Sequence, residues 1–317
     1  MTRSGIEAWV APLGDFFSEK LGQRARVSDL RRLAEGHSRQ MLVAHVEAGD
    51  TTHRYVVRIE QGGIFGTSGA EEYRIMGALF EAAFPVAQVR WLEPSDSLLG
   101  EPFFVMDYVD GEPDPPPDET LREFVVTLER LHHLDWEKAG LDFELKPTSA
   151  EEATHMQIER WLNVSRESTA LPVPLLEEAA AWLHHHAPSE GRMCIVHGDP
   201  GPGNFVHAGG KILALTDFEF THLGDPFEDF VFCAAMRGPR ALDRDGWIAL
   251  YREVAGVELT QEQWRYWEAF NLFKGAAANT TALRVFCQGD NPAPNLAIVG
   301  TALHQSFLRQ VSELIAP

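Results

Sequence analysis

The residue pattern of the chain changes at a short proline-rich tract, Glu112-Pro-Asp-Pro-Pro-Pro-Asp118. Before the tract, three short segments alternate apolar, often β-branched, residues with polar ones, a pattern typical of strands. These segments are residues 26–34, 40–47 and 53–60. Turn-forming residues separate them, so they predict an antiparallel meander. After the tract, apolar residues recur every three or four positions, which indicates helices with one buried stripe. The pattern predicts an α+β fold with a small, mostly antiparallel-β N-terminal lobe and a larger, mostly helical C-terminal lobe.

Further elements refine this division. A helix is predicted over residues 70–84, where Ser68 and Glu71 have the spacing of a capping box. Residues 103–106 predict a buried strand that leads into the proline tract. Helices are also predicted at residues 121–134, 151–164 and 175–186 and across residues 226–316. With 317 residues, and about 150 residues per domain, the chain is long enough for two lobes. A ligand cleft between them is expected.

The composition restricts the partners. Lys and Arg number 27 and Asp and Glu 47, which gives a net charge of −20. An acidic surface repels phosphate backbones and anionic lipid, so we expect neither a nucleic-acid nor a membrane partner. Residues 1–20 lack the apolar core of a signal peptide, and the three cysteines are too scattered for a disulfide framework. We therefore expect a cytoplasmic protein. The composition does not indicate an oligomeric state.

Residues 194–219 carry the chemistry. The segment begins Cys194-Ile-Val-His197-Gly-Asp199-Pro-Gly-Pro-Gly-Asn204 and ends Thr-Asp217-Phe-Glu219. A short apolar strand is followed by a loop with two prolines and two glycines, which must hold a fixed irregular shape. Two apolar runs then flank a Gly-Gly pair, which predicts a β-hairpin.

The hairpin brings oxygen-bearing side chains together. It places Asn204 beside Asp217, and Asp199 on the preceding loop lies at the same end. An amide oxygen and a carboxylate suit Mg²⁺, which takes phosphate oxygens as its other ligands. We therefore predict Asn204 and Asp217 as metal ligands and Asp199 as the base that accepts a hydroxyl proton, the division that phosphoryl transfer needs. The alternative is that these side chains only satisfy backbone donors of the loop. His197 is expected to brace the loop.

This ordered set resembles the kinase-like small-molecule phosphotransferases, the aminoglycoside phosphotransferase and choline kinase group, whose fold is similar to that of protein kinases. Within the group, the chain is most similar to the branch that also occurs fused to acyl-CoA dehydrogenases. Segments that support this branch are Tyr55-Val-Val-Arg58 and residues 72–76, 85–89, 100–111, 128–136 and 222–229. The resemblance extends from about residue 24 to the C-terminal helices.

The resemblance implies a role for each lobe. Residues 1–106 form a nucleotide-binding lobe, residues 107–118 a hinge, and residues 119–317 a helical lobe with the catalytic hairpin and the acceptor site. Asp199 is implied as the catalytic base. Arg58 stands where this fold usually has a lysine that contacts the nucleotide phosphates, and Glu72 on the first helix pairs with it. The alternative for Arg58 and Glu72 is a plain surface ion pair.

Two further segments are implied to contact the nucleotide. Gly36, His37 and Ser38 form the turn that covers the phosphates, although it has a single glycine and an ordinary hairpin turn is the alternative. Met106 and Tyr108 fall in the hinge that presents backbone groups to adenine.

The implied function is an ATP- and Mg²⁺-dependent phosphotransferase that acts on a hydroxyl of a small molecule. Glu219 stands where a protein kinase has glycine, and no Ala-Pro-Glu segment follows, so a protein kinase is disfavoured. A nucleotide-binding pseudokinase and a metal-dependent phosphoesterase are the alternatives. Asp225 and Asp229 are expected to bond backbone groups, and Asp225 is the candidate for bracing the active loop. The resemblance leaves the acceptor open: the branch suggests a hydroxylated acyl compound, and the group name suggests an aminoglycoside. Four residues are candidates for lining its site: Arg160, Trp161, Glu268 and Asn271.

Overall fold

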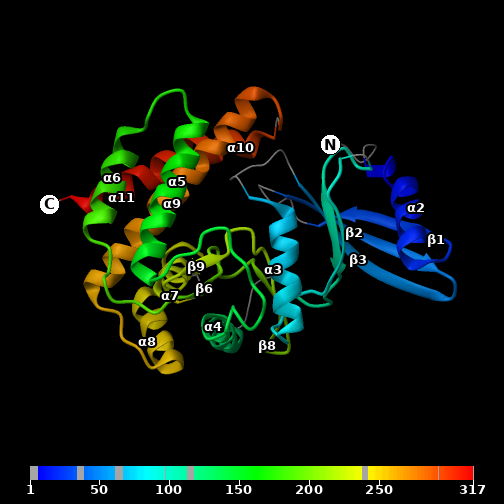
Figure 1. Cartoon of the computed structure of the whole chain (residues 1–317), viewed down its shortest axis with the longest axis horizontal. Helices are drawn as coiled ribbons and strands as arrows, with labels where there is room; N and C mark the ends of the chain where they lie inside the picture. Colours follow the sequence, from blue (N-terminus) through cyan, green and yellow to red (C-terminus); the bar gives the residue numbers. More distant parts are fainter. Residues whose placement is uncertain are drawn as a thin grey trace. The chain divides into compact units, whose positions relative to one another are not determined.

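The computed structural model describes residues 6–33, 39–60, 67–96, 98–112, 118–237, 242–291 and 293–316. The chain divides into two compact units, Met1–Asp110 and Gly111–Pro317. Figure 1 colours the first unit from blue to cyan-green and the second from green to red. Within the described ranges, no helix is both long enough and apolar enough to cross a membrane.

A five-stranded sheet forms the centre of the first unit (Figure 1). Its strands are β1 (Ala25–Arg32), β2 (Arg39–Ala48), β3 (Thr51–Glu60), β4 (Val89–Glu93) and β5 (Phe103–Asp107). Their order is β1-β2-β3-β5-β4, and neighbouring strands run antiparallel. Ala48 pairs with Thr51 across a two-residue turn whose Gly49 has a φ of 59°. The predicted meander is therefore confirmed.

Helices α2 (Val10–Leu21) and α3 (Gly69–Glu81) accompany this sheet. Helix α2, which the sequence pattern did not predict, stacks Phe17 on Tyr55 with the ring centroids 5.4 Å apart. Helix α3 begins after Ser68, as predicted, and ends three residues before the predicted boundary. Ser68 is the N-cap residue, as predicted. Its side chain accepts the N–H of Ala70 at 3.2 Å rather than that of Glu71, so the hydrogen bond predicted for the capping box is wrong.

The second unit is mainly helical, as the pattern after the proline tract predicts. Its first elements are α4 (Asp118–His132), α5 (Ala150–Ser168), α6 (Pro174–His185), β6 (Cys194–Val196), β7 (Phe205–Ala208), β8 (Lys211–Leu215) and β9 (His222–Gly224). Then follow α7 (Pro226–Phe232), the π-helical turn η2 (Cys233–Arg237), α8 (Arg244–Ala255), α9 (Gln261–Gln288), α10 (Pro294–Ile298), η3 (Val299–Leu303) and α11 (His304–Ile315). Two small antiparallel ladders, β6 with β9 and β7 with β8, interrupt the helices.

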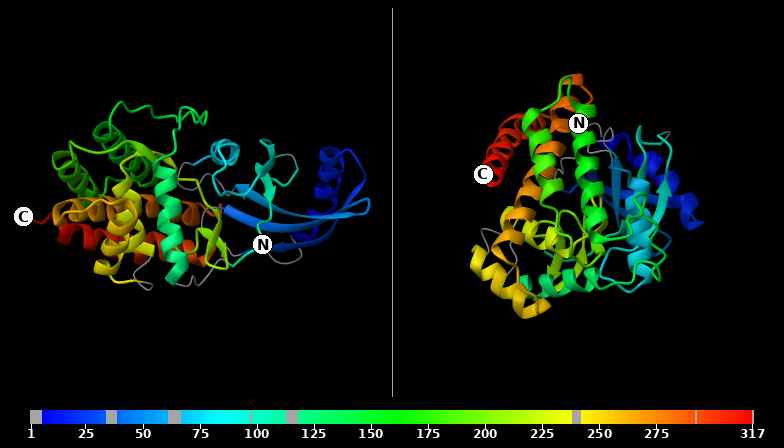
Figure 2. Two further views of the ribbon diagram at one scale, coloured as in Figure 1. Left: turned by 90° about the horizontal axis from the view of Figure 1, so that it is seen from below. Right: turned by 60° about the vertical axis from the view of Figure 1, so that its left-hand side comes forward.

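Helix α9 forms the core of the second unit. It packs against α5, α6, α7 and α11, and Figure 2 shows it enclosed among other helices. Its side chains are buried on almost every face, including those of Trp264 and Trp267. Because a helix that is buried all round takes its polar residues into the interior with it, each such residue of α9 needs an internal partner.

Candidate active site

The predicted hairpin is present at the centre of the site. Strands β7 and β8 are joined by Gly209 and Gly210, whose φ angles of 55° and 74° are both positive, as a type I′ turn requires. At the open end, the Thr216 N–H donates to the carbonyl of Asn204 at 3.0 Å. The strand pairing thus extends to the residue just before Asp217 and sets Asn204 beside it.

Asn204 and Asp199 are joined directly. The amide nitrogen Nδ2 of Asn204 donates to the backbone carbonyl of Asp199 at 2.7 Å and to its carboxylate Oδ2 at 2.8 Å. Because the nitrogen side of the amide faces Asp199, the oxygen Oδ1 is the side-chain atom with which Asn204 can bind a cation. The negative charge of Asp217 lies close enough to help raise the pKa of Asp199. The structure therefore brings the three predicted residues together.

Asp217 has an uncommon backbone conformation. Its φ is 69°, in the left-handed region that a residue other than glycine rarely adopts. Such conformations cost of order 1–3 kcal/mol and are concentrated at functional sites. The strained backbone lies directly after the hairpin, where the sequence analysis places a metal ligand.

His197 braces the loop, as the sequence predicts. The Asp199 N–H donates to its Nδ1 at 3.3 Å, and its Nε2 lies 3.0 Å from the carbonyl of Thr216. Since Nδ1 accepts this hydrogen bond, it carries no proton, so the ring is neutral and Nε2 donates. Burial lowers the pKa of His197, which agrees with a neutral imidazole. The ring links the loop before the hairpin to the strand end after it.

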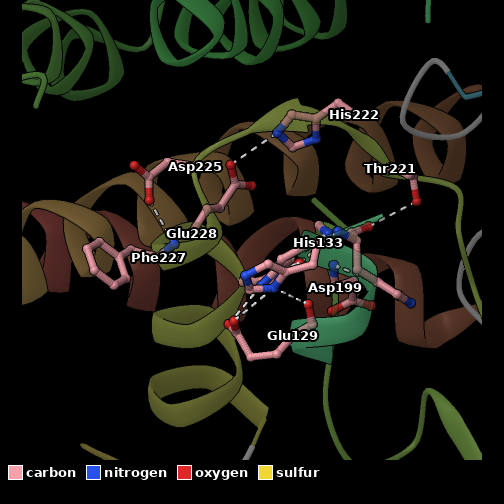
Figure 3. A network of polar contacts seen from close by, with 12 residues as sticks. Glu129, His133, Asp199, Thr221, His222, Asp225, Phe227 and Glu228 are labelled. Atoms are coloured by element: carbon pink, nitrogen blue, oxygen red, sulfur yellow. Dashed lines mark hydrogen bonds and ion pairs between the residues drawn. The ribbon is translucent and has the colours of Figure 1, made fainter. Parts of the chain in front are cut away.

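A buried carboxylate holds the backbone of the same loop. Asp229 in α7 accepts the N–H of His197 at 2.7 Å and that of Gly198 at 2.8 Å. Behind it, His132 lies 3.0 Å from Asp229 and 3.2 Å from Glu129. Burial alone would lower the pKa of His132, but the hydrogen bonds to these two carboxylates outweigh it and the pKa is raised. Figure 3 shows part of this network, with Glu129 and Asp199 labelled.

A buried lysine holds the loop from the other direction. Lys274 of α9 donates to the carbonyl of Gly198 and to Glu228 Oε1, both at 2.7 Å. The other carboxylate oxygen of Glu228 lies 3.1 Å from Nε2 of His222 (Figure 3). Burial would raise the pKa of Glu228, but Lys274 and His222 lower it to about 2. Sequence reasoning missed Lys274, whose signal was a lone cation within the apolar stretch of a long helix.

Asp225 and Asp229 both bond backbone groups, as expected. The Asp225 carboxylate accepts the Phe227 N–H at 2.8 Å and caps α7 (Figure 3). Asp229, one helical turn later, reaches the active loop instead. The prediction that Asp225 braces the loop is therefore wrong, because only the residue one turn inside the helix faces the loop. Burial raises the pKa of Asp225 to about 6.

Arg237, at the end of η2, was also missed. Its Nε donates to Asp199 Oδ1 at 3.0 Å, and its Nη2 forms an ion pair with Oδ2. Burial raises the pKa of Asp199, and Arg237 opposes that rise. Nothing in the spacing of the sequence connects these two residues, which are 38 positions apart.

In the first unit, Arg58 of β3 and Glu72 of α3 form the predicted pair. Arg58 Nε donates to Glu72 Oε2 at 2.8 Å, and their side chains are only 3% and 1% exposed. The alternative of a surface ion pair is therefore wrong. Because both groups are desolvated, each depends on the other to compensate its buried charge.

Of the other residues predicted to contact the nucleotide, the structure describes Met106 and Tyr108. Met106 is buried in β5, and the Tyr108 N–H donates to the carbonyl of Arg54 at 3.1 Å, so the sheet extends into the predicted hinge. Gly36, His37 and Ser38 lie outside the described residues.

The acceptor candidates are mostly internal. Trp161 and Asn271 are buried, and the Asn271 amide donates to the carbonyl of Glu228 at 3.0 Å. Glu268 accepts the indole N–H of Trp264 at 2.9 Å, and the Arg160 guanidinium lies 5.6 Å from the Trp161 ring. Trp161 and Asn271 therefore belong to the core rather than to a surface that faces a substrate.

The donor set at the hairpin fits Mg²⁺. Across the residues that the structure describes, no group of three or more His, Cys, Asp and Glu side chains could hold a metal ion. An amide oxygen from Asn204 and a carboxylate from Asp217 are hard oxygen ligands, and a site with so few protein ligands leaves positions for phosphate and water. Such a site suits a magnesium ion that arrives with a nucleotide.

Comparisons with known proteins agree with this geometry. The phosphotransferase enzyme family model matches residues 29–270. Mouse acyl-CoA dehydrogenase family member 10 is 30% identical over 236 residues, which are 65% of this chain and 22% of that protein. Choline kinase LicA from Streptococcus pneumoniae has a TM-score of 0.64 at 13% identity and covers 95% of this chain and 99% of its own. A thermostable mutant of the aminoglycoside phosphotransferase APH(4)-Ia, in complex with ADP and hygromycin B, has a TM-score of 0.64 at 16% identity and covers 96% and 99%.

These likenesses confirm the kinase-like fold and the resemblance to the branch found in acyl-CoA dehydrogenase family members. The chain spans about a fifth of the length of the mouse relative, 22%. Three quarters of the chain lie within the family match, and the hairpin with its flanking loop lies inside it. The chain therefore belongs to the phosphotransferase enzyme family.

Proposed function

We propose that this protein transfers the γ-phosphoryl group of ATP to a hydroxyl of a small molecule, with Mg²⁺ as the metal. One observation carries the proposal: the hairpin that ends at Asp217 holds Asn204 with its amide nitrogen 2.8 Å from the carboxylate of Asp199. Membership of the phosphotransferase enzyme family separately supports a small-molecule phosphotransferase. The complex of APH(4)-Ia with ADP supports an adenine nucleotide.

Asp199 acts as the base in this proposal. Its carboxylate accepts the proton of the acceptor hydroxyl as that oxygen attacks phosphorus. Burial raises the pKa of Asp199 and so strengthens it as a proton acceptor. Asn204 and His197 fix the position of its side chain and backbone.

Asn204 and Asp217 hold the metal with their oxygen atoms. When bound, Mg²⁺ neutralises charge on the phosphates and aligns them for in-line transfer. Asn204 therefore has two functions, because its nitrogen orients the base while its oxygen binds the metal.

Arg58 supplies positive charge for the nucleotide phosphates, and Glu72 fixes its direction. A protein with a net charge of −20 needs such local cations to bind a triphosphate. The pair is buried and hydrogen-bonded, so little side-chain freedom remains to be lost on binding. Met106 and Tyr108 are assigned to the adenine ring, and Gly36, His37 and Ser38 to the phosphates.

The test is Asp199→Asn, with Asp245→Asn as the matched control because Asp245 is an exposed carboxylate in the first turn of α8. ADP release is measured with Mg·ATP and a panel of hydroxylated metabolites, and nucleotide affinity by calorimetry. We expect Asp199→Asn to lower turnover by about 10²–10⁴-fold with nucleotide binding retained. Wild-type turnover in that variant would show that Asp199 is not the base. Failure of the wild-type protein to bind Mg·ATP would overturn the function itself.

A further inference from the structure

We infer that Arg237 selects an acceptor that carries a carboxylate near the hydroxyl to be phosphorylated, and that it disfavours cationic acceptors. The inference rests on the proposed function of the Asp199 site and specifies its substrate class. It starts from the contact between a guanidinium and both oxygens of the assigned base.

Arg237 lies beside the position that an acceptor hydroxyl needs. Its Nε donates to Asp199 Oδ1 at 3.0 Å, and its Nη2 pairs with Oδ2. A hydroxyl that gives its proton to this carboxylate must approach the same two oxygens, so it comes within reach of the guanidinium. The Arg237 side chain is 36% exposed, so a molecule that enters from solvent can reach it.

The chain is built to let Arg237 approach. Gly201 in the active loop has a φ of 137°, and a Cβ there would lie 2.6 Å from Cβ of Arg237 and 3.1 Å from its Cγ. Only glycine provides this space and this backbone conformation. Arg237 also ends a π-helical turn, a distortion of α-helical geometry that is often found at functional sites.

The charge of the guanidinium decides which acceptor can take that place. A guanidinium has five N–H donors, and Arg237 binds Asp199 through Nε and Nη2. A carboxylate on an acceptor bound at Asp199 can therefore form a charged hydrogen bond with the same guanidinium. An ammonium group on the acceptor would instead be repelled by the positive charge of Arg237, which disfavours cationic acceptors.

The experiment compares matched acceptors of equal chain length: short hydroxy acids, their amides, and the corresponding amino alcohols. ADP release with Mg·ATP is measured for the wild type, Arg237→Gln and Arg237→Lys. Arg122→Gln is the control, because Arg122 is an exposed arginine that pairs with Glu253 in the same unit. We expect kcat/KM at least about tenfold higher for hydroxy acids than for their amides or amino alcohols. Arg237→Gln should lose this preference mainly through KM, Arg237→Lys should keep part of it, and Arg122→Gln should match the wild type.

The inference is overturned if the wild type uses amino alcohols as well as hydroxy acids, or if the preference is unchanged in Arg237→Gln. Phosphorylation of no hydroxy acid in the panel also overturns it. If the wild type then still binds Mg·ATP and releases ADP with another acceptor, the proposed phosphotransferase activity stands. A wild-type protein that binds no Mg·ATP counts against both.

Discussion

The ammonium group of Lys274 donates a 2.7 Å hydrogen bond to the backbone carbonyl of Gly198, the residue before Asp199. The N–H of the same glycine is bound by Asp229 at 2.8 Å. Gly198 has a φ of 87°, so its unusual backbone is held at both polar groups by buried charges of opposite sign. Asp199 is therefore positioned by groups that do not touch its side chain.

Removing Lys274 should destabilise the second unit. Lys274→Met leaves the Glu228 carboxylate buried, with His222 still 3.1 Å away, and breaking a buried pair in this way costs about 3–5 kcal/mol. The double variant with Glu228→Gln should recover part of that loss, because the uncompensated charge is gone. Urea unfolding measures both. Lys146→Met, at an exposed lysine paired with Asp142, is the control and should change stability little.

Asp229→Asn should weaken the loop without removing its side chain. The amide has one oxygen for the two N–H groups of His197 and Gly198, so a buried donor loses its acceptor. We expect a loss of about 1–3 kcal/mol in the free energy of unfolding and slower ADP release. Asp243→Asn is a matched control, since Asp243 caps α8 and asparagine caps equally well. Equal stability of the two variants would contradict the role of Asp229.

Asp225 gives the stability a defined pH dependence. Its pKa is about 6 in the folded protein and 3.8 as an ordinary carboxyl, so the fold favours the protonated form. Its stabilising contribution is complete below pH 3.8 and is lost as the pH rises through 6. Asp225→Asn retains a capping oxygen and does not titrate. The free energy of unfolding of this variant minus that of the wild type should rise by about 3 kcal/mol between pH 3.5 and pH 7. Denaturant unfolding over this pH range measures the difference, and a constant difference would contradict the assignment.

Nucleotide affinity should depend on the buried arginine in β3. Arg58→Met removes the cation assigned to the nucleotide phosphates. Because a charged hydrogen bond is lost, the Kd for Mg·ATP, measured by calorimetry, should rise at least about tenfold. Arg58→Lys keeps the charge but not the planar group that pairs with Glu72, so its effect should be intermediate. Arg26→Met, at an exposed arginine paired with Glu47, is the matched control. Unchanged affinity in Arg58→Met would exclude Arg58 from nucleotide binding.

Local sequence signals predicted much of this protein. The Gly209-Gly210 turn, the strands beside it and the joining of Asn204 to Asp199 follow from backbone preferences that act over a few residues. The same holds for the meander of the first unit. Helix α2 was missed because the partners of its apolar side chains, such as Tyr55 for Phe17, lie on strands far along the chain.

Only the tertiary structure decided which charges support the site. Asp229, Lys274 and Arg237 lie 31, 76 and 38 positions from the loop residues they bind, and no spacing rule connects residues so far apart. Whether such a group is a surface charge or a buried partner depends on which segments pack over it. Likewise, the sequence pointed to Arg58 and Glu72 as a pair, whereas packing of α3 on the sheet decided that they are buried. Turn chemistry is local and can be read from neighbouring residues, but desolvation of a charge is a property of the assembled core.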